Sequence, residues 1–315
     1  MTKRPLGRTG LSIDPLVLGG NVFGWTLDEA QSFAVLDAYL DHGFTMIDTA
    51  DAYSLWVEGN CGGESETIIG NWMAARGNRD KVVLATKVGT RFDKNAKDLS
   101  AAYIEKAAED SLRRLKTDHI DLYFAHWPDP TVTHEETLRA FERLITSGKV
   151  SHIGCSNYDA GLLRDALQSS ADSGLPRYEV LQNEYNLYAR EKFEGAVQEL
   201  VTDEEIGVIV YWGLAAGFLT GKYRSEADFA KSARGGGMAK YLNAKGFAIL
   251  GAMDAVAADT GASHAEIALA WLAAQPGVTA PIASATSVAQ VESLARGAAL
   301  TLNAEHLQAL SKAGT

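Results

Sequence analysis

Residues 82–88, Val-Val-Leu-Ala-Thr-Lys-Val, form a short and almost continuous apolar run. An amphipathic segment follows at residues 99–115, and a second apolar run, Ile-Asp-Leu-Tyr-Phe-Ala-His, occupies residues 120–126. Continuous apolar runs are typical of parallel strands that are covered on both faces. This stretch therefore predicts a strand, a helix and a second strand parallel to the first.

The same unit recurs along the chain. The predicted strands are residues 16–20, 44–50, 82–88, 120–126, 151–156, 180–183, 207–211 and 280–283. Helical patterns include residues 27–41, 99–115 and 134–147, and the residues expected to cap helices are Ser100, Thr133 with Glu136, and Ser263. Eight such units in 315 residues, without a break in composition, predict a single (β/α)8 (TIM) barrel domain spanning residues 1–315. A doubly wound open sheet is the alternative.

Two segments fall outside this repeat. Residues 1–13 precede the first predicted strand and are expected to form a short N-terminal plug at the barrel floor. The last two predicted strands start roughly 70 residues apart, whereas the other starts are roughly 30 apart. The extra length begins after Tyr211 and predicts a long functional loop after the seventh strand.

Composition excludes several classes of protein. Acidic residues outnumber basic ones by 40 to 29, a net charge of −11 that disfavours binding to nucleic acid or anionic membranes. We find no apolar stretch of about 18 residues and no signal peptide, so the protein is expected to be cytoplasmic. Cys61 and Cys155 cannot form a disulfide framework, and scattered histidines predict no metal site. The oligomeric state cannot be predicted from the sequence.

Residues that carry chemistry follow the predicted strands. In a (β/α)8 barrel the carboxyl ends of the strands face the active site. Asp48 and Tyr53 follow the second strand, Lys87 lies in the third, and His126 ends the fourth. A lysine inside an apolar strand needs an acid partner, which Asp48 can provide. The ammonium is then expected to lower the pKa of Tyr53, while His126 orients and polarises a carbonyl oxygen.

Each of these residues alone also has a purely structural interpretation. Tyr53 could be a rim aromatic residue, Lys87 a surface lysine and His126 a hydrogen-bonded core histidine. Their convergence on one end of the barrel favours a proton-transfer site. Four tryptophans follow strands in the same way, and with Phe23 they are expected to line an apolar substrate pocket; they are Trp25, Trp56, Trp127 and Trp212. Ordinary packing beneath the loops is the alternative.

Positive charge gathers in the loop after the seventh strand. Between Gly221 and Gly246, six basic residues face two acidic ones, Glu226 and Asp228; the basic residues are Lys222, Arg224, Lys231, Arg234, Lys240 and Lys245. Barrels often bind phosphate near strands seven and eight, so this loop predicts a site for a phosphorylated cofactor. A solvated run of charges is the alternative.

Six stretches together resemble the aldo-keto reductase superfamily, in its longer-chain bacterial branch. They are residues 43–54 (GFTMIDTADAYS), 62–66 (GGESE), 85–87 (ATK), 120–129 (IDLYFAHWPD), 148–157 (GKVSHIGCSN) and 217–223 (GFLTGKY). The resemblance implies a barrel that binds NADPH without a Rossmann domain and catalyses reversible hydride transfer between a carbonyl and an alcohol. It also implies a catalytic tetrad of Asp48, Tyr53, Lys87 and His126, with Tyr53 as the proton donor.

The resemblance further implies a set of cofactor contacts. Ser156, Asn157 and Gln182 would hold the nicotinamide carboxamide, and Tyr211 would stack on the ring. Backbone groups of Leu214, Ala216 and Gly217 would face the pyrophosphate, with charge from Lys222 and Arg234. From the residues alone, Ser156 and Asn157 could instead cap the helix before Ala160, and Gln182 could be an ordinary buried polar residue.

The chain departs from the family pattern at two places. Trp212 and Gly213 stand where many relatives have Ser-Pro, so Trp212 is expected to reshape the pocket wall. Near the C-terminus the pattern runs through Ser284, Thr286 and Gln290, and an arginine that would clamp a 2′-phosphate is missing at Thr286. Gln290 is expected to reach the phosphate or ribose.

We therefore predict an NADP(H)-preferring carbonyl reductase or alcohol dehydrogenase, with NAD(H) possible, that acts on a small-molecule carbonyl or alcohol. One alternative is a nucleotide-binding sensor or regulatory subunit with little turnover. Another is an unrelated barrel that uses Tyr53 and Lys87 for lyase chemistry.

Overall fold

Eight parallel strands close into a barrel in the computed structural model, which describes residues 2–91, 96–232 and 234–314. In chain order the strands are β3 (Val17–Gly19), β4 (Met46–Asp48), β5 (Val83–Val88), β8 (Ile120–Ala125), β9 (Val150–Ser156), β10 (Val180–Glu184), β11 (Gly207–Tyr211) and β12 (Ala280–Ala283). Each strand pairs with the next, and β12 pairs with β3. All eight predicted strands and the (β/α)8 barrel are confirmed, and the open sheet is wrong because the barrel closes.

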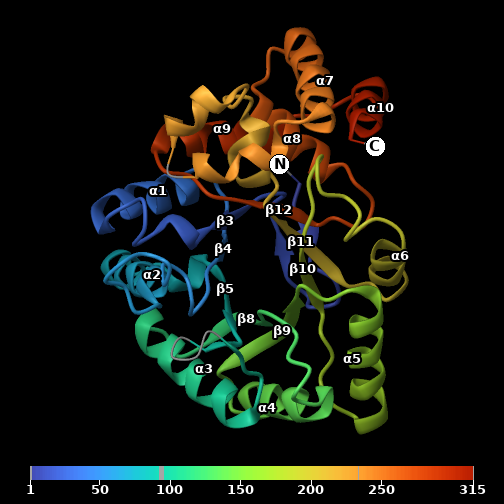
Figure 1. Cartoon of the computed structure of the whole chain (residues 1–315). Coiled ribbons are helices and arrows are strands. Elements are labelled where there is room, and N and C mark those ends of the chain that lie inside the picture. The colour runs from blue at the N-terminus through green and yellow to red at the C-terminus, as the bar shows by residue number, and fades with distance from the viewer. Residues whose placement is uncertain (1, 92–95, 233, 315) are drawn as a thin grey trace.

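Helices surround the barrel, which occupies the middle of Figure 1. They are α1 (Glu29–Asp41), α2 (Glu64–Arg76), α3 (Ala101–Leu115), α4 (His134–Thr146), α5 (Ala160–Ser173), α6 (Ala196–Asp203), α8 (His264–Ala273) and α9 (Val288–Ala299). Two further helices, α7 (Ala244–Thr260) and α10 (Ala304–Ala313), pack against each other. No helix in these described ranges is both long and apolar enough to cross a membrane.

The predicted helix starts are largely confirmed. The Thr133 hydroxyl accepts a hydrogen bond from the Glu136 backbone, and Ser263 forms a capping box with Glu266. Ser100 occupies the N-cap position of α3, but its side chain makes no capping hydrogen bond. Four strands, β3, β4, β5 and β8, are shorter than predicted. The largest differences are in β3, where Gly20 already begins a 3₁₀ turn, η1 (Gly20–Val22), and in β4, which ends at Asp48.

Side chains that point into the barrel are apolar at its floor and polar at its mouth. Met46, Ala85, Leu122 and Val180 belong to a fully buried cluster inside the barrel. Because side chains alternate along a strand, residues two or four positions further on also face inward. These positions hold Asp48, Lys87, His126 and Gln182. The strands therefore carry an apolar core below and a polar layer above it.

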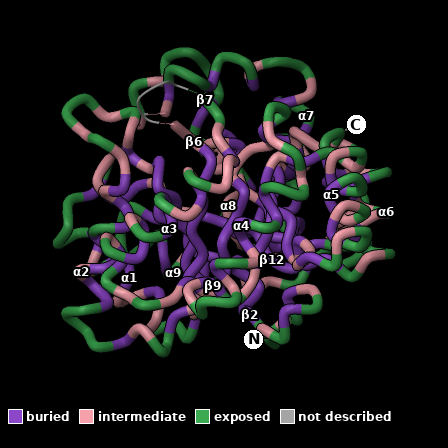
Figure 2. Tube along the Cα trace, turned by 90° about the horizontal axis from the view of Figure 1, so that it is seen from below, coloured by how far each residue is buried: buried purple, intermediate pink, exposed green. Residues whose placement is uncertain are grey.

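The N-terminal hairpin closes the floor of the barrel. It consists of β1 (Arg4–Pro5) paired with β2 (Ser12–Ile13). Leu6 and Ile13 are fully buried and join the apolar cluster inside the barrel. The Arg4 guanidinium donates hydrogen bonds to the carbonyls of Ala273 and Thr279, at 2.7 and 3.3 Å. The predicted plug is confirmed. In Figure 2 the buried trace lies in the middle of the molecule and exposed segments surround it.

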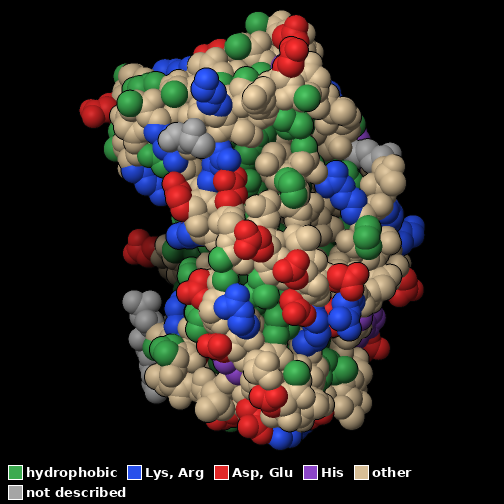
Figure 3. Space-filling model, turned by 90° about the vertical axis from the view of Figure 1, so that its right-hand side faces the viewer, with side chains coloured by type: hydrophobic (Ala, Val, Ile, Leu, Met, Phe, Trp, Pro, Cys, Tyr) green, Lys and Arg blue, Asp and Glu red, His purple; other side chains and the backbone are tan. Residues whose placement is uncertain are grey.

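The segment after β11 is long, as predicted, but it is not without structure. It contains the 3₁₀ helices η3 (Ala215–Thr220), η4 (Glu226–Lys231), η5 (Gly235–Gly237) and η6 (Ala239–Tyr241) before α7 begins. A second insertion, the short hairpin of β6 (Thr90–Arg91) and β7 (Ala96–Lys97), follows β5. On the face shown in Figure 3, basic and acidic side chains are interspersed.

Candidate active site

Lys87 is fully buried at the mouth end of β5. Its ammonium donates hydrogen bonds to Asp48 Oδ2 and the Thr49 carbonyl, both at 2.7 Å, and to the Tyr53 hydroxyl at 2.9 Å. Burial lowers the pKa of Lys87, and the neighbouring Asp48 carboxylate opposes that shift. The structural alternative of a surface lysine is therefore wrong.

Asp48 holds the other side of this arrangement. The carboxylate is 1% exposed, and its Oδ2 accepts from Lys87 and, at 3.3 Å, from the Tyr53 hydroxyl. Its Oδ1 accepts from Gln182 Nε2 at 2.8 Å. Gln182 lies on β10, so this bond crosses the barrel and fixes the carboxylate against both strands. The cost of burying two charges is offset by these short charge-assisted hydrogen bonds.

Tyr53 lies in the loop after β4. Burial and then the Asp48 carboxylate raise its pKa well above the usual value of 10. The expectation that this pKa is lowered is wrong, because burial and the Asp48 carboxylate outweigh the stabilisation that the Lys87 ammonium gives the phenolate. Tyr53 is thus a protonated phenol at neutral pH.

His126 follows β8 and lies beside Tyr53, with a ring-centroid separation of 6.2 Å. Burial, followed by the charges of Lys87 and Lys97, lowers its pKa well below 6.5. The imidazole is therefore neutral at pH 7. Its Nδ1 atom is buried and has no hydrogen-bond partner within the described residues. A neutral ring with an unused nitrogen can bind a ligand through a hydrogen bond.

Asn157, Ser156 and Tyr211 line the neighbouring wall of the mouth. The Asn157 amide donates to the His126 carbonyl at 2.9 Å and accepts from the Tyr211 hydroxyl at 2.6 Å. The Ser156 hydroxyl donates to the Gln182 carbonyl at 2.7 Å. The interpretation of Ser156 and Asn157 as helix caps is wrong, because Asp159 caps α5.

The backbone is strained around this wall. Asn157, Trp212 and Ala216 all have left-handed φ values, of 64°, 56° and 56°. Such conformations concentrate at functional sites. Ala216 and Gly217, with a φ of 105°, form a kink inside η3, and the Leu214 carbonyl accepts from Gly217 N at 2.8 Å. These are the residues predicted to face a pyrophosphate.

The basic loop is neutralised in part. Three of its six cations form ion pairs, Arg224 with Asp254, Lys231 with Asp228, and Lys245 with Glu191. Across the described residues, Lys222, Arg234 and Lys240 form no ion pair, and their cationic groups lie 5.1, 5.1 and 5.4 Å from the rings of Tyr223, Trp25 and Trp212. Lys222 and Arg234 thus remain available to an anion.

The C-terminal residues predicted to bind the cofactor lie between β12 and α9. The Ser284 hydroxyl donates to Asn21 Oδ1. Gln290 Oε1 accepts from the Thr286 backbone at 2.8 Å and its hydroxyl at 3.2 Å. Gln290 therefore closes a small turn at the start of α9.

The four predicted tryptophans lie around the mouth. Trp25 and Trp56 are in edge contact at 5.6 Å, and Trp56 lies 6.1 Å from Tyr53. Trp127 stacks against His126 at 5.7 Å, and Trp212 is in edge contact with Tyr211 at 5.8 Å. Phe23, by contrast, is fully buried in the core between barrel and helices, so its prediction as pocket lining is wrong.

Sequence reasoning missed three contributors to the site. Thr49 supplies a carbonyl to Lys87, and Asn183 Oδ1 accepts from the Asn157 backbone at 2.8 Å. Lys97, on β7, lies 3.9 Å from the ring centroid of Trp127. The polar pair Gln182-Asn183 at a strand end could have indicated Asn183. Lys97 carries no such signal, because it sits in an irregular segment.

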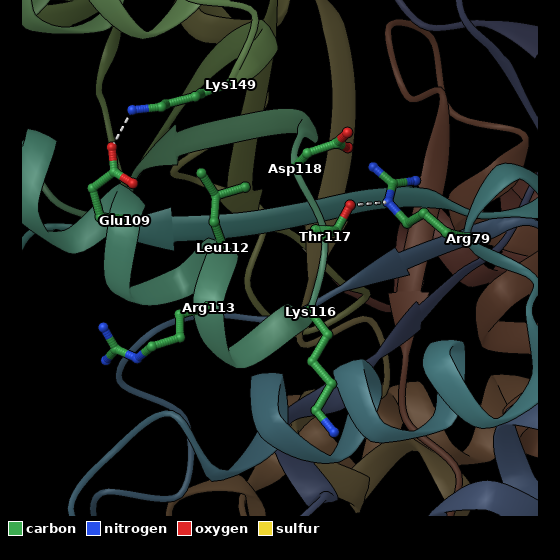
Figure 4. Close-up of a pocket in the computed structure, with 8 residues that line it drawn as sticks. All are labelled: Arg79, Glu109, Leu112, Arg113, Lys116, Thr117, Asp118 and Lys149. Carbon is green, nitrogen blue, oxygen red and sulfur yellow. Dashed lines mark hydrogen bonds and ion pairs between the residues drawn. The ribbon is translucent and has the colours of Figure 1, made fainter.

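A hollow at the opposite end of the barrel is unrelated to this site. Figure 4 shows its lining, which includes Arg79, Glu109, Lys116 and Lys149. Lys149 pairs with Glu109, and Arg79 with Asp121. Arg79 precedes β5, Lys116 lies between α3 and β8, and Lys149 precedes β9, so the hollow lies at the floor.

A family model and several known proteins match nearly the whole chain. The family model described as "Aldo/keto reductase family" matches residues 15–314. An uncharacterized oxidoreductase, YrpG, of Bacillus subtilis is 36% identical over 97% of this chain and 94% of its own length. The aldo-keto reductase YhdN of the same organism is 35% identical over 91% of this chain and 84% of its own length. A probable voltage-gated potassium channel subunit beta of Arabidopsis thaliana is 30% identical over 93% of this chain and 89% of its own length.

Proposed function

Because this chain belongs to the aldo/keto reductase family, a family of NAD(P)-dependent oxidoreductases, we propose that it interconverts aldehydes or ketones and alcohols with Tyr53 as the proton donor. The observation that carries this proposal is the contact of one buried ammonium, Lys87 Nζ, with both Asp48 and Tyr53. Nicotinamide, when bound, supplies the hydride that reaches the carbonyl carbon.

The residues of the site transfer the proton and stabilise the charges that develop. Tyr53 gives its hydroxyl proton to the carbonyl oxygen as that oxygen gains negative charge, and Lys87 stabilises the resulting phenolate. The 2.9 Å contact with the Lys87 ammonium stabilises the phenolate as the proton leaves. The neutral His126 polarises the same oxygen through a hydrogen bond. Solvent then returns a proton to Tyr53.

The wall beside Tyr53 fits a nicotinamide. Ser156, Asn157 and Gln182 carry hydroxyl and amide groups, the types that suit a carboxamide, and would exchange some of their present hydrogen bonds for it. The Tyr211 hydroxyl is held by Asn157, which fixes the plane of the phenol ring for stacking. Leu214, Ala216 and Gly217 would present backbone to the pyrophosphate, with Lys222 and Arg234 beside them.

Isotope transfer tests the reaction itself. With NADPH deuterated on the transferred face and 4-nitrobenzaldehyde, we expect the deuterium in the carbinol carbon of the alcohol product. An alcohol without deuterium, or no alcohol at all, would contradict the proposal.

The potassium channel subunit among the relatives favours a second candidate, a nucleotide-binding sensor. Tight NADPH binding with negligible turnover across an aldehyde panel would support that candidate.

We also propose that the protein prefers NADP(H) to NAD(H), through Gln290 and through Lys222 and Arg234, which have no ion pair among the described residues. Fluorescence titration is expected to give a lower Kd for NADPH than for NADH. Equal or reversed affinities would overturn the preference without touching the proposed reaction.

A further inference from the structure

Lys97 is a cation at the mouth whose contact among the described residues is with an aromatic ring, not with an acid. It lies on β7, is exposed, and among the described residues it forms neither an ion pair nor a hydrogen bond. Two acids in the described part of this region, Asp98 and Asp129, already have partners. Asp98 pairs with Arg91 at 2.9 Å, and the Asp129 carboxylate accepts from Leu99 N at 3.0 Å and from the Thr131 hydroxyl at 2.6 Å. In a chain of net charge −11, such a free ammonium is conspicuous.

Lys97 is connected to the proposed reacting centre through its contact with Trp127. Its ammonium lies 3.9 Å from the ring centroid of Trp127, and that ring stacks on His126 with an interplanar angle of 23°. His126 in turn lies beside Tyr53. The separations of 5.7 Å between His126 and Trp127 and 3.9 Å between Trp127 and the ammonium place the ammonium less than about 10 Å from the imidazole. The rest of a substrate whose carbonyl oxygen is held by Tyr53 and His126 would lie in this interval.

We propose that Lys97 and Trp127 form a subsite that selects carbonyl substrates carrying a carboxylate about one aromatic ring away from the reacting carbon. The proposal rests on the proposed function and specifies its substrate class. Trp127 offers an aromatic contact to the substrate ring, and Lys97 binds the carboxylate. Because the anion contacts Lys97 in both the ground state and the transition state, the preference belongs to KM rather than kcat.

A matched pair of substrates tests the subsite. 4-Carboxybenzaldehyde and 4-formylbenzamide have nearly the same shape, but only the first is charged. At about 0.01 M salt, where the Debye length is about 30 Å, we expect kcat/KM to favour the carboxylate about five- to tenfold. Lys97→Gln should bring the ratio close to one, and Lys97→Arg should restore it. Lys116→Gln, which removes the same charge at the floor, should leave it unchanged.

Binding separates this proposal from the proposed function. NADP⁺ cannot reduce an aldehyde, so calorimetric titrations of the protein, with and without NADP⁺, measure affinity alone. We expect the Kd of 4-carboxybenzaldehyde to be lower than that of 4-formylbenzamide by the same factor. This difference should disappear in Lys97→Gln. If neither aldehyde is ever reduced, the proposed function fails, while the Kd ratio still decides the role of Lys97. A wild-type ratio of one, or a ratio that survives Lys97→Gln, would overturn the subsite.

Discussion

At the scale of single residues, one buried lysine, Lys87, donates hydrogen bonds to both Asp48 and Tyr53. Lys87 and Asp48 neutralise each other, and each also contacts Tyr53. A charge that loses its partner in a buried site is strongly destabilising, whereas removing both charges costs much less. The pair therefore contributes to stability and to chemistry in ways that can be separated.

Replacing the lysine alone makes this separation measurable. Lys87→Met should lower the free energy of unfolding by about 3–5 kcal/mol, because Asp48 is left buried without its cation. The double variant Asp48→Asn/Lys87→Met should recover most of this loss but not the activity. Urea unfolding and kcat/KM for an aldehyde measure the two effects. Activity that returns together with stability would show that the pair is only structural.

The pKa directions at the site predict the pH dependence of reduction. The raised pKa of Tyr53 keeps the phenol protonated through neutral pH, and the lowered pKa of His126 keeps its imidazole neutral. Neither group changes charge between about pH 6.5 and 9, so kcat/KM for reduction should be flat there. Alcohol oxidation needs the phenolate and should rise with pH over the same range. A step in reduction between pH 6 and 8 would assign the proton to another group.

The residues at strand ends could be predicted from sequence, because a barrel brings those ends together. The hydrogen-bond partner of Asp48 across the barrel could not be predicted from the sequence. Gln182 stands 134 residues further along the chain, and only the closure of the barrel places its amide on the carboxylate. The pKa of Tyr53 was predicted in the wrong direction, since burial and the shared carboxylate depend on the folded environment.

At the scale of elements, the apolar runs predicted all eight strands, whereas the connecting loops were less readable. The 3₁₀ helices after β11 and the hairpin of β6 and β7 have no strong periodic pattern. Lys97 could not be predicted for this reason: its place beside Trp127 comes from loop geometry.

The N-terminal hairpin offers a test at this scale. Leu6 is fully buried in the cluster inside the barrel, so Leu6→Ala should lower the free energy of unfolding by about 2–5 kcal/mol. The floor lies at the opposite end from Tyr53, and kcat should therefore be retained in the folded variant. Denaturant unfolding monitored by tryptophan fluorescence measures the loss. A change well below 1 kcal/mol would mean that the hairpin does not seal the barrel.

At the scale of the whole molecule, the proposed function requires a chain of net charge −11 to bind an anionic dinucleotide. The Debye length is about 10 Å at 0.1 M salt, so scattered acids are screened while adjacent cations still act. Arg234→Gln should therefore weaken NADPH binding and reduce its dependence on salt, as measured by fluorescence titration. Lys116→Gln, with the same change in net charge, is the control. Equal effects of the two variants would point to global charge rather than the loop.

The most direct test of the central claim is the Tyr53→Phe variant, because it removes one hydroxyl and keeps the ring. Provided that it folds and binds NADPH with the parent Kd, we expect its kcat for 4-nitrobenzaldehyde to fall at least about a hundredfold, the contribution typical of general acid catalysis. Reduction at the parent rate would contradict the assignment of Tyr53 as the proton donor.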